Sequence, residues 1–197
     1  MHNFKLEVAD ILVNVNWRHD PYSEIKRWAL ASPYEHVFMY MGWVGLQRSD
    51  HVSSYLSSVP MLFESNAQGV VLQNIHKRYG QEVVVMRLKS DHDRERITHV
   101  LDEAINLAGT PETVYDYFCI VRFILPRLIC EKLGIPMPLA WHRNPLHVCS
   151  EAVFEIFYRA KLVDILPSWR VPLPGDFVTD SPLLEKVWRG RLSEELV

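Results

Sequence analysis

Residues 149–160 have the sequence CSEAVFEIFYRA, and this stretch decides how the rest of the chain is interpreted. Its apolar positions are 149, 152, 153, 156, 157 and 160, a spacing that predicts a helix with one buried stripe. Cys149 is the first member of that stripe. A thiol in the first turn of a helix lies among unpaired backbone N–H groups at the positive end of the helix dipole, and both stabilise the thiolate. The stretch predicts either a reactive cysteine or a small buried hydrophobe.

The other two cysteines lack this setting. Cys119 and Cys130 lie eleven residues apart, on one face of an expected helix and away from its first turn, so we expect them in the core. Three cysteines in 197 residues do not form a disulfide framework. Reduced thiols, and with them a reducing compartment, are therefore expected.

A reactive thiol needs a base, and the chain has nine histidines. His36 opens an expected strand over 36–43, where its ring can reach past the rim of a sheet to a helix terminus. Glu64 lies in the next confident strand, over 61–64. If the two strands pair, the carboxylate can orient the imidazole and stabilise its charged form. Taken singly, each is more typical of a structural or solvated side chain. His51 is a rival base.

The first half of the chain has the pattern of strands and the second half that of helices. Short β-branched and aromatic runs predict strands over 10–15, 36–43, 61–64, 69–72 and 82–88. Helical spacing predicts helices over 22–31, 91–108, 111–133, 149–162 and 183–189. Gly109 and Gly134 end two of them, and Pro126 should kink or split the third. Loops are expected over 43–60, 134–147 and 167–182. Strands followed by helices predict an α+β fold.

Length and charge exclude several classes of protein. A chain of 197 residues, 48% of them apolar, fits one globular domain, which we place at 1–197. A net charge of −3 and the absence of a stripe of basic and aromatic residues argue against nucleic-acid binding. The N-terminus lacks the pattern of a signal peptide, and the apolar stretch 117–130 is too short and charged to span a bilayer. We therefore expect a soluble, cytoplasmic protein without stable membrane insertion.

A metal site is the other chemistry that deserves a test here. His142, His147 and Cys149 lie close together in the sequence, but zinc sites need a fourth ligand and paired motifs. No Cys-x-x-Cys, His-Glu-x-x-His or deaminase signature is present. We expect neither a metal nor another cofactor.

Six short motifs, taken in order, resemble one family. The order of His36, Glu64 and a helix-opening Cys149 is similar to that of the circularly permuted branch of the NlpC-type papain-like cysteine hydrolases, the YiiX/YebB-like group. In ordinary papain-like chains the cysteine helix comes before the histidine strand. The matching segments are ADILVN (9–14), SPYEHV (32–37), LFES with GVV (62–65 and 69–71), YDY (115–117), VCSE (148–151) and PGDF (174–177).

The resemblance covers residues 9–185 and implies a role for each matching residue. It implies a papain-like antiparallel sheet packed against helices, with the nucleophile helix after the sheet. Cys149 would be the nucleophile, His36 the base and Glu64 the group that orients it. Tyr115 falls where the family keeps an active-site aromatic. The implied activity is that of a cysteine peptidase or amidase, a hydrolase whose substrates include cell-wall peptides.

Two departures and two rival functions stay open. Ala9 replaces the glycine of the family's opening motif, and the link over 43–60 is longer than expected. The same thioester chemistry would also serve an acyltransferase related to lecithin retinol acyltransferase, or a lipid-acyl hydrolase, although the typical Asn-Cys-Glu-His-like motif is absent. A module that keeps the fold without turnover is the third reading. The oligomeric state is not evident.

Overall fold

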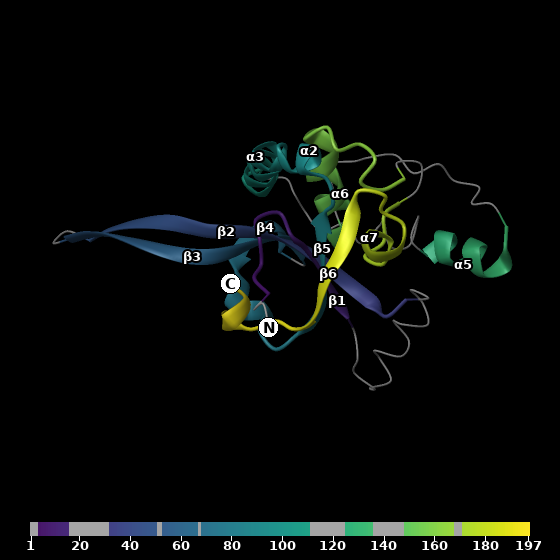
Figure 1. Ribbon diagram of the computed structural model, residues 1–197, viewed down its shortest axis with the longest axis horizontal. Coiled ribbons are helices and arrows are strands. Elements are labelled where there is room, and N and C mark those ends of the chain that lie inside the picture. The colour runs from purple at the N-terminus through teal and green to yellow at the C-terminus, as the bar shows by residue number, and fades with distance from the viewer. Residues whose placement is uncertain are drawn as a thin grey trace.

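The computed structural model describes residues 4–15, 32–50, 53–66, 68–110, 125–135, 148–167 and 171–197. Within helices and strands, the side chains of 46–50, 53–57, 125 and 128 are outside that description. In these ranges the chain forms an antiparallel sheet with helices against one face (Figure 1). The expected α+β class is therefore confirmed.

The sheet has six strands in the order β4-β3-β2-β1-β5-β6. Every neighbouring pair is antiparallel. β1 is central and buried along its whole length. The bounds are β1 Ile11–Val15, β2 Tyr34–Asp50, β3 Ser53–Asn66, β4 Gly69–Asn74, β5 Glu82–Leu88 and β6 Leu184–Arg191. The five strands expected from the sequence are all present, and β5 has the predicted bounds.

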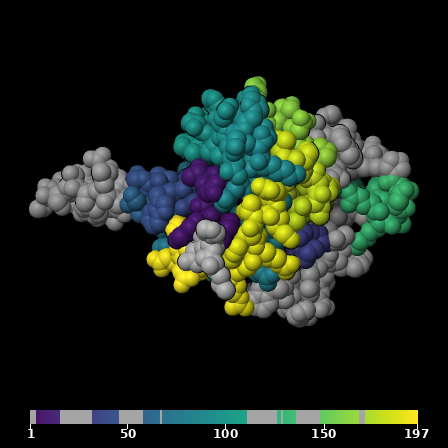
Figure 2. Space-filling view, in the orientation of Figure 1, coloured from purple at the N-terminus to yellow at the C-terminus, as the bar shows by residue number. Residues whose placement is uncertain are grey.

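The two faces of the sheet bury different partners. One face packs against α3 (Ile97–Ala108) and α6 (Cys149–Arg159), whose apolar stripes fill the main core. On the other face, a smaller core includes Phe38 and Leu62. Both chain ends close this second face, where the Leu6 N–H donates to the Leu196 carbonyl at 2.7 Å. Figure 2 shows the purple N-terminal and yellow C-terminal segments side by side there.

The expected helix over 183–189 is wrong, because residues 184–189 belong to β6. The strand pairs with β5 from Glu82↔Arg191 to Leu88↔Leu184 and covers an edge that would otherwise be unpaired. Trp188 also stacks on Phe4, with ring centroids 5.4 Å apart. This long-range pairing overrides a local pattern that suited either structure.

The link over 43–60, expected to be a loop, is also different. Residues 43–50 and 53–60 continue β2 and β3 as a two-stranded ribbon, in register from Trp43↔Pro60 to Asp50↔Ser53. Figure 1 shows the ribbon running well beyond the rest of the sheet. Its serines and glycine do not give the alternation of apolar and polar residues that predicts a strand. The hydrogen-bonded ladder of a hairpin forms without a buried face, so the pattern was absent although the strands are present.

The remaining helices are described in part, and one of them is divided. The helix expected over 91–108 is divided into α2 (Asp91–Arg94) and α3, and Gly109 ends the second as expected. α5 is described over Leu125–Leu133 and includes Pro126, and Gly134 follows with φ 66°. The rest of the helix expected over 111–133, and that over 22–31, lie outside the described residues. Three short pieces are η1 (Ile75–Arg78), α7 (Asp176–Thr179) and η3 (Glu194–Leu196).

Among the described residues, no helix combines the length and the apolar character that crossing a membrane would require.

Candidate active site

The three residues singled out from the sequence lie where α6 begins against β2 and β3. His36 is near the start of β2, and Glu64 near the end of β3. The two strands pair with Met39 opposite Phe63, which brings these strand ends together. Cys149 is the first residue of α6. The antiparallel pairing thus juxtaposes groups that are 28 and more residues apart in the sequence.

The three side chains form a continuous hydrogen-bonded run. His36 Nε2 lies 3.0 Å from Glu64 Oε2. The ring of His36 is also hydrogen-bonded to the Cys149 side chain. Because Nε2 faces the carboxylate, Nδ1 is the ring nitrogen left for the sulfur. The structure therefore brings together thiol, imidazole and carboxylate in the order that nucleophilic catalysis requires.

Glu64 is completely buried, and its carboxylate is surrounded by donors. Oε1 accepts from Asn66 Nδ2 at 2.9 Å and from Gln73 Nε2. Oε2 accepts from Arg78 as well as from His36. Burial alone would raise the pKa of Glu64, but the hydrogen bonds and positive charges of His36 and Arg78 lower it to about 2. The carboxylate is consequently ionised at neutral pH.

The environment also favours the charged forms of His36 and Cys149. Burial works against an imidazolium, yet the Cys149 thiolate and the Glu64 carboxylate together raise the pKa of His36 to about 9. Burial likewise opposes a thiolate, but the charge and hydrogen bond of His36, with the backbone N–H groups of Val37 and Ser150, lower the pKa of Cys149. Each group thus favours the charged form of the other, thiolate for Cys149 and imidazolium for His36.

The residues that follow the cysteine hold the start of α6 in place. The Glu151 carboxylate accepts a hydrogen bond from the Val148 backbone N–H at 3.0 Å, as in a capping box. Ser150 Oγ donates to the Pro172 carbonyl at 2.7 Å. The segment CSE therefore combines a thiol, a tether to the loop before α7, and a helix cap.

A second tether fixes the same loop from α5. The buried guanidinium of Arg127 donates to Asp176 at 2.8 and 3.0 Å and to the Val171 carbonyl. Asp176 also accepts from the Leu173 backbone N–H at 2.8 Å. These bonds explain why an aspartate follows the Pro-Gly pair at 174–175.

A hollow of about 320 Å³ lies between this loop, α5 and the start of β2. It adjoins the loop that Ser150 anchors and the strand that carries His36. A Cβ on Gly175 would lie 2.9 Å from Ser32 Oγ and 3.3 Å from the Tyr34 ring, so a larger residue there would require these side chains to move. The residues that line the hollow are Ser32, Pro33, Tyr34, Arg127, Glu131, Leu173, Pro174, Gly175, Asp176, Thr179 and Asp180.

Sequence reasoning missed the donors around Glu64. Arg78 ends η1, Asn66 is the last residue of β3, and Gln73 lies on β4 opposite Leu62. Gln73 lies two residues after Val71, so the alternation of a strand places both side chains on the same face of β4, and Val71 pairs with Glu64. This spacing could have predicted Gln73 as a partner of Glu64. No local pattern in the sequence predicts Arg78. The expected roles of Tyr115 and His51 concern residues outside the described ranges. His142, His147 and Cys119 also lie outside the described ranges.

Comparisons with known proteins find a shared fold. No protein-family model matches the chain, and no curated protein matches it. Among solved structures, the crystal structure of the metalloprotein yiiX from Escherichia coli O157:H7 superposes with a TM-score of 0.59. The match covers 96% of this chain and 100% of that one, at 15% sequence identity. The chain therefore has a yiiX-like α+β fold, and identity this low shows the fold alone.

The comparison protein is described as a metalloprotein, which makes a metal site worth testing. In the part of the chain that the structure describes, no three His, Cys, Asp or Glu side chains gather into a group that could hold a metal ion. The donors of Glu64 are an imidazole, a guanidinium and two amides, a set that suits an orienting carboxylate rather than a ligand. These residues do not fit a metal centre.

Proposed function

We propose that this protein is a cysteine hydrolase that cleaves amide bonds of peptides, cell-wall peptides among them, through a thioester on Cys149. In this proposal His36 is the base, Glu64 orients it, and residues 1–197 form one permuted papain-like domain of the NlpC type. The observation that carries the proposal is the hydrogen-bonded run from the Cys149 thiol through the His36 ring to the buried Glu64 carboxylate.

The first half of the reaction forms the thioester. The Cys149 thiolate attacks the carbonyl carbon of the amide, a C–S bond forms, and the carbonyl electron pair moves to oxygen. The backbone N–H of Cys149 lies in the first turn of α6, where a helix has no internal acceptor, and can donate to that oxyanion. When the tetrahedral intermediate collapses, the C–N bond breaks and the His36 imidazolium gives its proton to the leaving amine.

The second half returns the enzyme to its starting state. His36, now neutral, takes a proton from a water molecule that attacks the thioester carbon. The C–S bond then breaks, the Cys149 thiolate is restored and the carboxylic acid leaves. Glu64 holds the ring so that Nδ1 faces the sulfur throughout, and it stabilises each imidazolium that forms.

The hollow beside the loop over 171–176 is the place that we assign to one side of the substrate. Its walls mix apolar surface from Pro33 and Leu173 with polar groups, as a peptide side chain would require. Tyr115, expected to line the site, stays a prediction.

The proposal is tested by labelling and by turnover. Iodoacetamide followed by mass spectrometry should modify Cys149 at pH 6, where ordinary thiols react slowly. Cys149→Ala should abolish labelling, whereas Cys130→Ala should leave it unchanged, since Cys130 is also a buried free cysteine but lies inside α5. Labelling that persists in Cys149→Ala would contradict the assignment of the nucleophile.

Turnover separates hydrolysis from its rivals. A panel of peptide amides and acyl esters should give a transient acyl adduct on Cys149 and a free acid as product. A stable fatty-acyl adduct, or transfer of the acyl group to an added amine instead of water, would show an acyltransferase. Absence of any adduct over the whole panel, together with a thiol that titrates normally, would show a module without turnover.

A further inference from the structure

Arg78 meets both Glu64 and His36, a position that a simple thiol, imidazole and carboxylate arrangement does not need. Its Nε and one terminal nitrogen lie 3.1 and 2.5 Å from Glu64 Oε2. The same terminal nitrogen lies 3.3 Å from His36 Nε2. Arginine and imidazolium therefore converge on one carboxylate oxygen.

The geometry fixes the proton on the ring. A guanidinium only donates, so it cannot share a hydrogen bond with an N–H. With Oε2 accepting from both groups, His36 Nε2–H and Arg78 point toward the same oxygen with their positive charges side by side. Phe38 supports this arrangement, because the Arg78 guanidinium carbon lies 5.4 Å from the centre of its ring and the His36 ring lies 5.8 Å from it.

We propose that Arg78 is a positioning residue that shares the Glu64 carboxylate with His36 and thereby limits how strongly the imidazole holds its proton. This inference rests on the proposed function, for which it adds a residue that nothing in the sequence marked. A carboxylate devoted to His36 alone would hold the proton of the imidazolium more firmly and make its delivery to a leaving amine less favourable. Arg78 withdraws part of that attraction and keeps Glu64 ionised and fixed.

The charge balance around His36 supports this role. Among the described residues, the charged groups that face the ring are Cys149 from α6, Glu64 from β3 and Arg78 from η1. Glu35 is its neighbour on β2, where its carboxylate accepts from Asn14 at 3.5 Å. With the thiolate and imidazolium formed, Arg78 is the positive charge that brings the cluster of Cys149, His36, Glu64 and Arg78 to neutrality.

The experiment is an NMR titration of the His36 imidazole in protein labelled with ¹⁵N-histidine. Arg78→Gln should move the titration midpoint of His36 upward by about one pH unit, because a like charge has been removed from its side. Arg78→Lys, which keeps the charge but not the two-pronged geometry, should stay closer to wild type. Arg189→Gln is the matched control: Arg189 also pairs with a glutamate, Glu82, but lies on β6, which β1 and β5 separate from β2, and it should leave the midpoint unchanged.

A second pair of variants protects the test against a loss of folding. Glu64→Gln should lower the midpoint, and adding Arg78→Gln to it should move the midpoint back upward, because the positive charge left beside the ring is then removed. An unchanged or lowered midpoint in Arg78→Gln, or equal shifts in Arg78→Gln and Arg78→Lys, would overturn the proposal. So would a double variant that titrates no higher than Glu64→Gln.

The titration is independent of catalysis. Repeated in the Cys149→Ala background, Arg78→Gln should again raise the midpoint relative to Cys149→Ala alone. If Cys149 failed to label or to turn over any substrate while this shift persisted, the proposed function would fail and the role of Arg78 would stand. If Cys149 were reactive and the shift absent, the role of Arg78 would fail alone.

Discussion

The two most deeply buried carboxylates among the described residues are each met by an arginine, yet the two clusters differ in what else they contain. Asp10, just before β1, accepts from Arg87 of β5 at 2.8 and 2.7 Å and from the Glu7 backbone N–H at 2.8 Å. Glu64 accepts from an arginine too, but its other charged partner is an imidazole. Both acids are at most 1% exposed.

The difference separates a structural cluster from the cluster that we propose is reactive. Around Asp10, the donors are a guanidinium and a backbone amide, neither of which changes its charge in the ordinary pH range. That cluster ties the N-terminal segment to β5. Around Glu64, the imidazole can gain and lose a proton and leads on to a thiol. A buried carboxylate–arginine pair is thus no sign of function until a titratable third partner joins it.

The largest expected effect belongs to the structural cluster. Asp10→Ala leaves Arg87, which is only 14% exposed, without its bidentate partner and should lower the free energy of unfolding by about 4 kcal/mol. Equilibrium unfolding in urea measures this loss of free energy of unfolding. Glu7→Ala, which removes an exposed partner of the same arginine, should lower it by less than about 1 kcal/mol. Equal losses in the two variants would erase the distinction between a buried and an exposed partner.

The reactive cluster should instead show itself through pH. The pKa of Glu64 is about 2 in the folded protein and near 4.5 when unfolded, so its stabilisation is complete above pH 4.5 and is lost as the pH falls toward 2. The stability of wild type relative to Glu64→Gln should therefore shrink by about 3 kcal/mol between pH 5 and pH 2. Urea midpoints across that range measure it, and a difference that does not vary with pH would contradict the lowered pKa.

Reactivity of the thiol is the next smaller effect. Without its imidazolium, Cys149 should approach an ordinary thiol, of which only about 0.3% is thiolate at pH 6. His36→Ala should therefore slow alkylation of Cys149 by iodoacetamide at pH 6 by about 100-fold. His92→Ala removes a histidine that is 77% exposed and should leave the rate unchanged. A rate in His36→Ala that matches wild type would show that the helix terminus alone activates the thiol.

The contrast between clusters also explains what the sequence could predict. Strand and helix periods located β5, α3 and α6 well, because each has one strongly apolar face. The same reasoning brought His36 and Glu64 together, since both lie at ends of expected strands that pair. Local pattern was enough wherever burial and pairing agreed with it.

The sequence-based predictions failed where a residue distant in the sequence determines the local structure or the contacts. Residues 184–191 form a strand because β5 offers an edge, which no local pattern shows. In the sequence, Arg78 belongs to the basic run HKR, which is typical of an exposed surface. In the structure, it ends η1, which follows β4, and its guanidinium lies over the Phe38 ring. Ala9 is a third case. It adopts φ 68°, in the left-handed region that favours glycine, which gives a physical reason for the glycine of the resembling family at this position.

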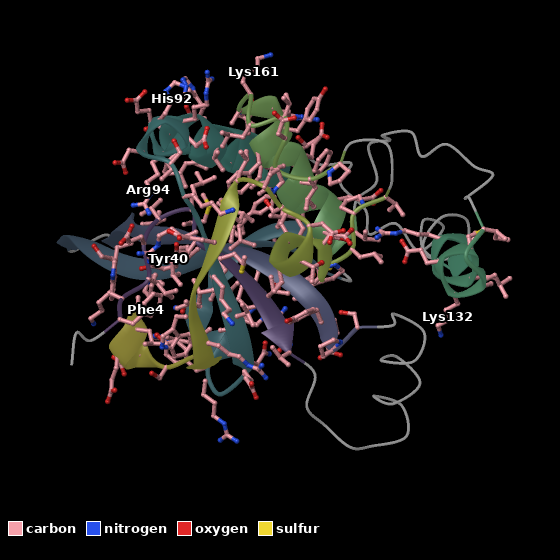
Figure 3. The ribbon with its side chains drawn as sticks, turned by 45° about the vertical axis from the view of Figure 1, so that its right-hand side comes forward. Phe4, Tyr40, His92, Arg94, Lys132 and Lys161 are labelled. Carbon is pink, nitrogen blue, oxygen red and sulfur yellow. The ribbon has the colours of Figure 1, made fainter. Side chains whose placement is uncertain are left out.

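The smallest expected effect concerns the far end of the helix that carries the thiol. Lys161 follows α6 with φ 71°, and it is exposed. Its N–H donates to the Tyr158 carbonyl and that of Leu162 to the Phe157 carbonyl, the pattern of a helix that ends on a left-handed residue. Lys161→Gly should relieve this conformation and raise the free energy of unfolding by about 1 kcal/mol. Figure 3 labels Lys161 beyond α6 and Lys132 on α5.

Lys132 provides the matched control, because it lies inside the last turn of α5 in ordinary helical conformation. Lys132→Gly should lower the free energy of unfolding by about 1 kcal/mol, the usual cost of glycine in a helix. The alkylation rate of Cys149 should be the same in both variants as in wild type, because reactivity depends on the first turn of α6 and on His36. A stabilised Lys161→Gly protein with altered thiol reactivity would instead show that the two ends of α6 are coupled, and the separation between structural and reactive clusters would no longer hold for this helix.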